Sequence, residues 1–186
     1  MRIITGKARG VKLNTLEGEN TRPTSERAKE AIFSMIQFDI EGREVLDLFA
    51  GSGQMGLEAV SRGALSATFI DKSKDAAKVI AQNIEKTKLS PACRLFNSDV
   101  NDFIRVTKGK KKYDVVFIDP PYALRAVAST LKALLEGEML KPTSIVVCES
   151  EETDVFESDS ALAEKFEIIK RAKYGVANIT IVKPLI

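Results

Sequence analysis

From about residue 40 onward, short apolar runs alternate with amphipathic stretches along the chain. This pattern is typical of repeated strand–helix–strand units and a mostly parallel sheet. It predicts strands near residues 44–49, 66–70, 92–97, 113–118 and 143–149. The helices between them are expected near residues 54–62, 73–87, 99–107 and 125–136. The central part of the chain is therefore predicted to be an α/β domain.

The C-terminal part has a different pattern. Residues 166–170 and 178–182 alternate between polar and apolar side chains around Tyr174-Gly175, which indicates an antiparallel pair of strands. Together with the five strands above, this makes seven, with the last one inserted antiparallel. We therefore expect a methyltransferase-type Rossmann fold.

The first forty residues do not belong to this series. Residues 2–5 and 10–13 can form a small hairpin around two glycines, and apolar residues between Ala28 and Phe38 recur at helical spacing. Thr24 and Ser25 are candidate N-cap residues for that helix. We divide the chain into a hairpin-and-helix extension, residues 1–40, and a core domain, residues 41–186.

Composition narrows the possible chemistry. The chain of 186 residues is 44% hydrophobic and 29% charged, as expected for a soluble globular protein, and it has neither a long apolar segment nor a signal region. We therefore expect a cytoplasmic protein. The absence of histidine excludes mechanisms that use an imidazole base, and with only two cysteines it argues against a zinc site. Cys93 and Cys148 are expected to be buried reduced thiols.

The net charge of +2 is small, but the basic residues are unevenly distributed. An N-terminal arm carries Arg2, Lys7, Arg9 and Lys12 with no acidic residue before Glu17. This arrangement suits a phosphate backbone. A second cluster precedes the strand near 113–118 and fits either a nucleic-acid contact or a solvated loop; it comprises Arg105, Lys108, Lys110, Lys111 and Lys112.

A strand, a glycine turn and a helix start follow one another between Val45 and Gly56. Gly51 and Gly53 permit a tight turn and close approach of a ligand to the helix N-terminus. The glycines alone match a dinucleotide fingerprint, and Asp71 lies at the distance at which a carboxylate binds ribose hydroxyls. NAD is therefore one candidate cofactor.

Three further features favour S-adenosylmethionine. Asp47 precedes the glycines, where a carboxylate repels a pyrophosphate but suits an ammonium group, directly or through water. Asp99 follows the third predicted strand, where it can accept a hydrogen bond from an adenine amino group. Asp119-Pro120-Pro121-Tyr122 has no role in hydride transfer, and no second substrate domain is expected. Four carboxylates, at positions 47, 71, 99 and 119, would line one crevice at the carboxyl ends of the strands.

The segment Asp119-Pro120-Pro121-Tyr122 directly follows an apolar strand. Two prolines make the loop rigid, the carboxylate offers acceptors, and the tyrosine ring offers a stacking surface. Such a clamp suits a planar group that carries an NH2. The same residues also occur in ordinary turns.

These motifs together resemble those of the RsmD-type methyltransferases, which methylate guanine N2 in the 16S rRNA of the small ribosomal subunit. The similarity covers nearly the whole chain. It rests on residues 2–10, Arg22-Pro23-Thr24 with Arg27, residues 47–53, Gly56-Leu57-Glu58-Ala59, Ser61-Arg62-Gly63-Ala64, Asp119-Pro120-Pro121-Tyr122 and Lys173-Tyr174-Gly175. Gln54-Met55 departs from the Ala-Leu expected in the glycine loop.

The resemblance implies a role for each matching segment. Gly51 and Gly53 would contact the methionine part of the cofactor, Asp71 the ribose and Asp99 the adenine. Their neighbours Asp47, Phe49, Lys72 and Val100, together with Asp119, belong to the same expected cofactor site. Asp119 to Tyr122 would hold the target base. Arg22, Pro23 and Thr24 would shape the cofactor and substrate pocket and contact the RNA. Arg27 and the arm would bind RNA.

Other functions share parts of this pattern. Adenine-N6 DNA methyltransferases also use Asp-Pro-Pro-Tyr, but the chain is short for a DNA-recognition domain. Protein glutamine methyltransferases share the fold and typically carry Asn at the position of Asp119. A non-catalytic RNA-binding assembly factor is the alternative from another class. No membrane or metal partner is expected.

Overall fold

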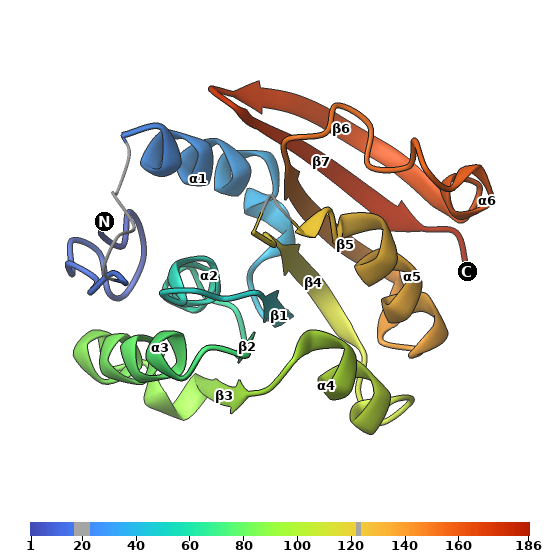
Figure 1. Cartoon of the computed structure of the whole chain (residues 1–186). Coiled ribbons are helices and arrows are strands. Elements are labelled where there is room, and N and C mark those ends of the chain that lie inside the picture. The colour runs from blue at the N-terminus through green and yellow to red at the C-terminus, as the bar shows by residue number, and fades with distance from the viewer. Residues whose placement is uncertain (17–22, 122–123) are drawn as a thin grey trace.

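A single sheet of seven strands organises the computed structural model, which describes residues 1–16, 23–121 and 124–186. The strand order is β3-β2-β1-β4-β5-β7-β6 (Figure 1). The strands are β1 (Glu44–Leu48), β2 (Ser66–Asp71), β3 (Cys93–Asn97), β4 (Tyr113–Ile118), β5 (Leu140–Ser150), β6 (Phe166–Tyr174) and β7 (Ala177–Pro184). Strands β1 to β5 pair in parallel, and β7 is antiparallel to both β5 and β6. The predicted fold is confirmed.

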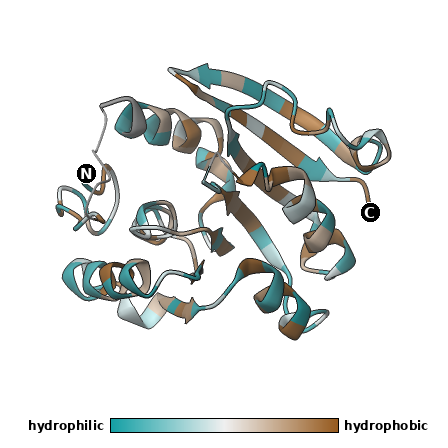
Figure 2. Cartoon of the chain, in the orientation of Figure 1, coloured by the Kyte–Doolittle hydropathy of each residue, from teal (hydrophilic) through white to brown (hydrophobic). Residues whose placement is uncertain are grey.

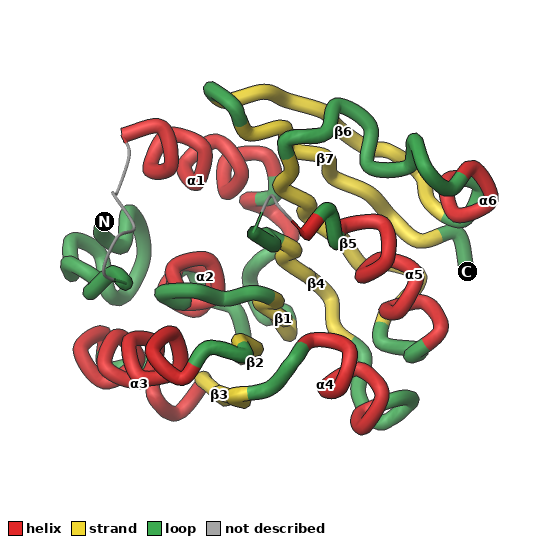
Figure 3. Tube along the Cα trace, in the orientation of Figure 1, coloured by secondary structure: helices red, strands yellow, loops and turns green. Residues whose placement is uncertain are grey.

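Helices cover both faces of the sheet, as the tube view shows (Figure 3). They are α1 (Pro23–Met35), α2 (Gln54–Ser61), α3 (Lys74–Thr87), α4 (Val100–Thr107), α5 (Val127–Glu136) and α6 (Ser160–Ala163). Single 3₁₀ turns lie at Gln37–Asp39 and Ser90–Ala92. No helix among the described residues is long and apolar enough to span a bilayer.

Two hydrophobic layers separate the helices from the sheet, and apolar residues run along the central strands (Figure 2). Because successive side chains of a strand point to opposite faces, each strand contributes to both layers. Val45, Phe69, Phe117 and Val147 pack under α1, α2 and α3. Their neighbours Leu46, Ile70, Ile118 and Cys148 pack under α4, α5 and α6. The strands β1, β2, β4 and most of β5 are thus buried on both faces, as expected for apolar runs in a parallel sheet, whereas β3 and β6 at the two ends of the strand order are largely exposed.

The N-terminal extension differs from the prediction in its local structure. The helix begins at Pro23, so Thr24 and Ser25 lie inside its first turn and neither is the N-cap. Proline is favoured in that turn because its missing N–H has no helical partner there. The helix ends at Met35, and Phe38 is 92% exposed in the following 3₁₀ turn. The expected hairpin is present in a short form: an antiparallel bridge joins Arg2 and Lys12, and the N–H of Ile3 donates to the carbonyl of Val11 at 3.0 Å.

Both cysteines are free thiols, as expected. Cys148 is fully buried in β5, and Cys93 is partly buried at the start of β3. Burial in apolar surroundings raises the pKa of Cys93 to about 12. The two thiols therefore behave as packing groups.

Candidate functional site

The carboxyl ends of the central strands bring the predicted acidic residues to one edge of the sheet. Leu48 of β1 pairs with Ile70 of β2 and with Ile118 of β4, so the next residues along these strands lie side by side. Asp71 ends β2, and Asp119 directly follows β4. Open α/β sheets bind ligands at this edge, next to the position where the strand order reverses. In this sheet that position lies between β1 and β4.

The turn after β1 is built from unusual backbone conformations. Gly51 and Gly53 have φ of 55° and 76°, and Phe49 has φ of 59°. A positive φ costs glycine little, but for an aromatic residue it is a strained conformation. Such strain gathers at functional sites, where the surrounding structure holds it. The backbone N–H of Gly51 donates to Asp71 Oδ2 at 2.9 Å, which ties the turn to the end of β2.

Helix α2 starts directly from this turn and packs closely on the sheet. A side chain at Gly56 would place its Cβ 2.3 Å from the ring of Phe69, so only glycine fits there. Gly53 occupies the N-cap position and has no side chain with which to cap the helix. A helix start without a side-chain cap leaves backbone N–H groups available to a ligand, and here the N–H of Gly56 in the first turn is bonded to Asp47.

Asp47 lies beneath the turn and is only 3% exposed. Its Oδ2 accepts a hydrogen bond of 2.9 Å from the backbone N–H of Gly56. Desolvation by burial raises the pKa of Asp47 to about 7, the Gly56 hydrogen bond lowers it, and the nearby Asp71 charge raises it further. The visible role of Asp47 is to hold α2 against β1. Its expected contact with an ammonium group stays a prediction.

Asp71 and Asp99, the two other carboxylates expected at the cofactor site, have different hydrogen-bond partners. Asp71 accepts from Gly51 and also from the backbone N–H of Ser73 at 2.8 Å, so it organises the turn after β2. Asp99 is exposed and caps α4 by accepting from the backbone N–H of Asn101 at 2.8 Å. Lys72 is exposed, while Val100 is 5% exposed and packs in the core. A ligand contact at Val100 would therefore come from its backbone.

The loop after β4 holds the predicted base clamp. Asp119 is exposed, Pro120 is buried and Pro121 is exposed. The carbonyl of Pro121 accepts a hydrogen bond of 2.9 Å from the backbone N–H of Leu124, which closes the loop. Tyr122 lies outside the described residues. The acidic end of the clamp therefore faces solvent at the edge of the sheet.

The N-terminal arm, residues 1–13, packs its apolar residues inward and its basic residues outward. Ile3, Ala8 and Leu13 are buried in the layer under α1, α2 and α3. Arg2, Lys7, Arg9 and Lys12 are all exposed. The arm thus forms a cationic surface although its hairpin pairing is minimal.

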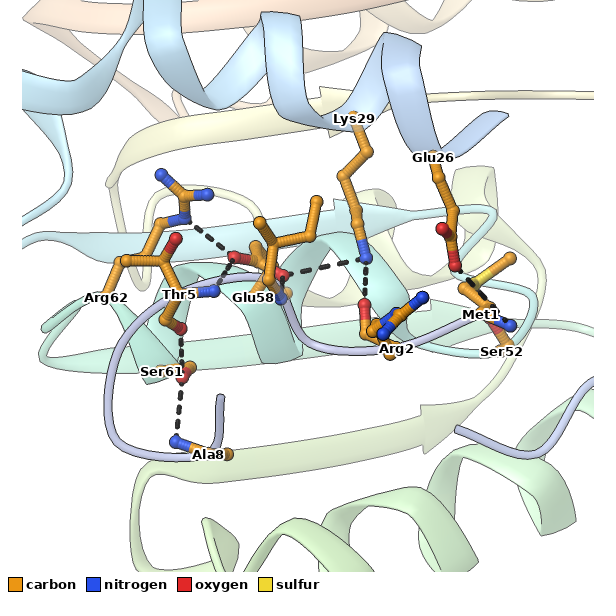
Figure 4. Close-up of polar contacts among 12 residues, drawn as sticks. Met1, Arg2, Thr5, Ala8, Glu26, Lys29, Ser52, Glu58, Ser61 and Arg62 are labelled. Atoms are coloured by element: carbon orange, nitrogen blue, oxygen red, sulfur yellow. Dashed lines mark hydrogen bonds and ion pairs between the residues drawn. The ribbon is translucent and has the colours of Figure 1, made fainter. Parts of the chain in front are cut away.

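A buried carboxylate on α2 fixes the arm (Figure 4). Glu58 is fully buried and accepts hydrogen bonds from the backbone N–H groups of Ile4 at 2.8 Å and Thr5 at 3.0 Å. Two cations neutralise it: Arg62 Nε lies 2.7 Å from Oε1, and Lys29 Nζ lies 3.6 Å from Oε2. One residue therefore joins the arm, α1 and α2.

Ser61, one turn further along α2, makes a second attachment (Figure 4). Its hydroxyl donates to the carbonyl of Thr5 at 2.6 Å and accepts from the N–H of Ala8 at 3.0 Å. Its carbonyl accepts from the N–H of Lys7 at 2.8 Å. Sequence reasoning gave no role to Glu58 or Ser61. The available signal was a glutamate within the apolar stretch of residues 57–60, because a charge on a buried helix must be paired.

A pocket of about 430 Å³ lies between the arm and α1. Its charged lining residues are Arg2, Arg9, Arg27, Glu26 and Glu30. Pro23 and Thr24 lie in the first turn of α1, and Arg22 lies outside the described residues. The structure thus brings Arg27 together with two of the four arm cations. Lys7 and Lys12 lie on the arm outside this pocket.

The second basic cluster lies elsewhere on the molecule. It occupies α4 and the loop before β4, at the opposite end of β4 from Asp119. Arg105 pairs with Asp102 at 2.9 Å, and Lys111 pairs with Glu44 at 2.9 Å. No group of three or more His, Cys, Asp or Glu residues among the described residues could hold a metal ion.

Comparison with known proteins gives a consistent set of relatives. The family described as conserved hypothetical protein 95 matches residues 1–183. Ribosomal RNA small subunit methyltransferase D of Haemophilus influenzae is 33% identical over 179 residues, which cover 96% of this chain and 91% of that protein. The protein of the same name from Escherichia coli K12 is 34% identical over 151 residues, covering 81% of this chain and 75% of that protein. The solved structure of Escherichia coli yhhF superposes with a TM-score of 0.83 at 28% identity, covering 99% of this chain and 97% of that one.

Proposed function

The chain belongs to the family described as conserved hypothetical protein 95, and from this membership we propose that it is an S-adenosylmethionine-dependent methyltransferase. Its proposed target is the exocyclic N2 amine of a guanine in the 16S rRNA of the small ribosomal subunit. The names of the two relatives support this substrate class. The observation that carries the proposal is the position of Asp119-Pro120-Pro121, directly after β4 and beside the glycine turn that follows β1.

The crevice has the donor and acceptor groups that S-adenosylmethionine needs. Asp71 would bind the ribose hydroxyls, because its carboxylate is half-buried at the end of β2 and already orients the turn. Asp99 would accept from the adenine amine with the oxygen that does not cap α4. The backbone of Gly51 and Gly53 would approach the methionine part closely. When bound, this cofactor supplies a methyl group activated by its sulfonium.

The chain's own residues would position and activate the guanine. The N2 lone pair is delocalised into the ring, so the amine is a weak nucleophile. The Asp119 carboxylate and the Pro120 carbonyl would accept its hydrogens, which favours a pyramidal nitrogen and stabilises the positive charge that develops there. Asp119 would then accept the proton that N2 loses after methylation. Tyr122 would stack on the base, a contact worth roughly 1–3 kcal/mol.

The arm would hold the RNA while the base is extruded into the crevice. Arg2, Arg9 and Arg27 line one pocket at which a phosphate would be bound, and Lys7 and Lys12 extend the same cationic surface. Phosphate contacts position a nucleic acid without reading its sequence. Arg22 to Thr24 would shape the pocket. Residues 1–40 would therefore serve RNA binding, and residues 41–186 catalysis, in the cytoplasm.

The direct test is methyl transfer from labelled S-adenosylmethionine to unmethylated small subunits, free 16S rRNA and DNA, followed by nucleoside analysis. We expect N2-methylguanosine in the ribosomal substrate. Label in N6-methyladenine of DNA would instead place the protein among the adenine methyltransferases. Cofactor binding without transfer to any substrate would favour a non-catalytic assembly role.

The Asp119→Ala variant tests the mechanism. Loss of an acceptor for the developing charge should lower kcat by about 10²- to 10³-fold, with cofactor affinity retained. Asp102→Ala is the matched control, because Asp102 is 62% exposed and pairs with Arg105 on the surface of α4. Undiminished turnover in Asp119→Ala would remove Asp119 from the reaction.

A further inference from the structure

A second carboxylate lies beside the base clamp. Ile118, the last residue of β4, pairs with Cys148 of β5, so Asp119, which directly follows β4, lies beside Glu149 of β5 at the carboxyl end of the two strands. Neighbouring strands are about 4.8 Å apart. Glu149 therefore lies next to Asp119 on the side away from the glycine turn, which follows β1 on the other side of β4.

Strand alternation places both side chains on the same face of the sheet. Phe117 and Val147, two residues before Asp119 and Glu149, pack in the layer under α1, α2 and α3. Side chains two residues apart on a strand share a face. Glu149 also pairs with Ile179 of β7, which packs in that same layer. Asp119 and Glu149 thus project above the carboxyl end of one core layer.

This edge of the sheet is open to a ligand. Asp119 is exposed and Glu149 is partly exposed. Pro120 and Glu149 line one pocket of about 330 Å³, which is within the size range of ligand sites. Both carboxylates already have partners within the protein. Because a carboxylate has about four lone-pair sites, these partners leave it able to accept from a base as well.

We propose that Glu149 determines the specificity for guanine: its carboxylate accepts the N1–H of the extruded base while Asp119 accepts from the N2 amine. This inference rests on the proposed function and adds a residue to its target site. In guanine, N1–H and N2–H2 are neighbouring donors on the Watson–Crick edge. Two adjacent carboxylates match that pair because an ionised carboxylate only accepts. Enzymes that act on an extruded base read it by hydrogen bonds to this edge.

The same geometry would reject a base without a proton at N1. Adenine and 2-aminopurine present a lone pair there, which would face the lone pairs of Glu149. A site built to hydrogen-bond a substrate N–H discriminates strongly against an analogue that lacks it. 2-Aminopurine is the sharper probe, because it keeps the 2-amino group and lacks only the N1 proton of guanine and its O6.

The experiment compares guanosine with 2-aminopurine at the methylated position. Nucleoside mapping with the wild-type protein first locates that position. Small subunits are then reconstituted with rRNA ligated to carry either purine there, and kcat/KM is measured for the wild type, Glu149→Gln and Glu136→Gln. The glutamine amide can donate to an unprotonated N1. Glu149→Gln should therefore reduce the preference for guanosine by roughly tenfold to a hundredfold.

Binding gives a readout that is independent of turnover. With S-adenosylhomocysteine present, the fluorescence of 2-aminopurine reports its extrusion and binding. Glu149→Gln should bind the 2-aminopurine substrate more tightly relative to the guanosine substrate than the wild type does. Glu136→Gln is the control and should keep the wild-type ratios, because Glu136 is an exposed residue at the end of α5 and does not line this pocket.

Each result bears on the inference. A lower preference for guanosine over 2-aminopurine in Glu149→Gln, but not in the control variant, supports the proposed role of Glu149. A wild-type ratio in Glu149→Gln, with methylation of guanosine intact, overturns the role of Glu149 and leaves the proposed function standing. A wild-type protein that methylates no guanosine overturns the proposed function and this inference with it.

Discussion

The side chains of Lys29 and Glu58 form an ion pair sealed from solvent, with Nζ 3.6 Å from Oε2 and exposed fractions of 1% and 0%. Lys29 Nζ also donates to the carbonyl of Arg2 at 2.7 Å. Burial lowers the pKa of Lys29, and the charge of Glu58 opposes that shift. A pair of buried charges survives only when each charge has close partners. Here those partners include the backbone of the N-terminal arm.

The first prediction concerns removal of either charge from this pair. Glu58→Gln should lower the free energy of unfolding by about 3–5 kcal/mol, because it leaves Lys29 buried without a counter-ion. Lys29→Met should cost less, since Glu58 keeps Arg62 and two backbone donors. Urea unfolding measures both. The control Asp102→Asn breaks an exposed pair and should cost under about 1 kcal/mol. Equal, small losses in all three variants would contradict a structural role for the buried pair.

The second prediction compares two glycines of the arm. A Cβ at Gly6 would lie 1.7 Å from the carbonyl oxygen of Ser61, whereas among the described residues nothing lies within 4 Å of a Cβ at Gly10. Both have positive φ, 88° and 83°. Gly10→Ala should therefore lose only about 1–2 kcal/mol, from its left-handed conformation. Gly6→Ala should lose the same amount for its left-handed conformation, and its Cβ must in addition push the arm away from Ser61 on α2.

Two measurements separate these variants. Urea unfolding should show a clearly larger loss of stability for Gly6→Ala. Proteolysis of the folded protein should cut the arm, which contains Lys7 and Arg9, faster in Gly6→Ala than in Gly10→Ala. If the two variants behave alike, the arm does not depend on its close approach to Ser61.

Interactions between residues close in sequence leave a pattern along the chain, whereas long-range contacts do not. The strands of the sheet were predicted because each contains a local apolar run, such as residues 115–118. The family was identified correctly because its motifs are also local. The arm's attachment was not predicted, since Ile4 and Glu58 are 54 residues apart. A glutamate in a helix is normally expected to face solvent, and only the tertiary contacts show that Glu58 is buried.

At the candidate site, too, some features could be predicted from the sequence and others depend on long-range contacts. Register along parallel strands follows from the fold, so the meeting of Asp71 and Asp119 at one edge could be expected. In the structure, Asp99 caps a helix and Asp47 accepts a buried hydrogen bond. The local sequence could not show whether these carboxylates serve such structural roles or bind a ligand. Arg22 and Tyr122 lie outside the described residues, and their roles stay predictions.

The third prediction concerns the pH dependence of stability through Asp47. Its pKa is about 7 in the folded protein against 3.8 when exposed, so the folded form holds the proton more tightly. Below about pH 4 the group is protonated in both states and has no effect. As the pH rises from about 4 to about 7, stability falls, by at most about 4 kcal/mol at about 1.4 kcal/mol per pKa unit.

Asp47→Asn should remove this dependence. Without cofactor, the variant should gain stability relative to the wild type as the pH rises from 5 to 8 in urea unfolding. Asp114→Asn is the control. Burial raises the pKa of Asp114, but the Glu44 backbone hydrogen bond and Lys141 outweigh it and the pKa is lowered. The stabilisation from ionised Asp114 is lost only below about pH 4. The difference in unfolding free energy between Asp114→Asn and the wild type should therefore stay constant from pH 5 to 8. A constant difference for Asp47→Asn as well would show that Asp47 is ionised throughout.

The fourth prediction concerns the charge of the arm. Replacing Arg2, Lys7, Arg9 and Lys12 by glutamine should weaken RNA binding, because each exposed cation that contacts a phosphate releases counterions. Each lost contact should also reduce the slope of log K against log salt concentration by about 0.7–0.9. Cofactor affinity should not change, since none of the four cations belongs to the turns after β1 and β2.

An equal loss of charge elsewhere is the matched control. Arg105, Lys108, Lys110 and Lys112 are exposed on α4 and the loop before β4, across the sheet from the arm. Their replacement by glutamine changes the net charge by the same amount. If the arm variant alone shows the shallower slope, RNA is bound at the arm. If both sets change the slope equally, the effect belongs to net charge, and the arm is not a specific RNA contact.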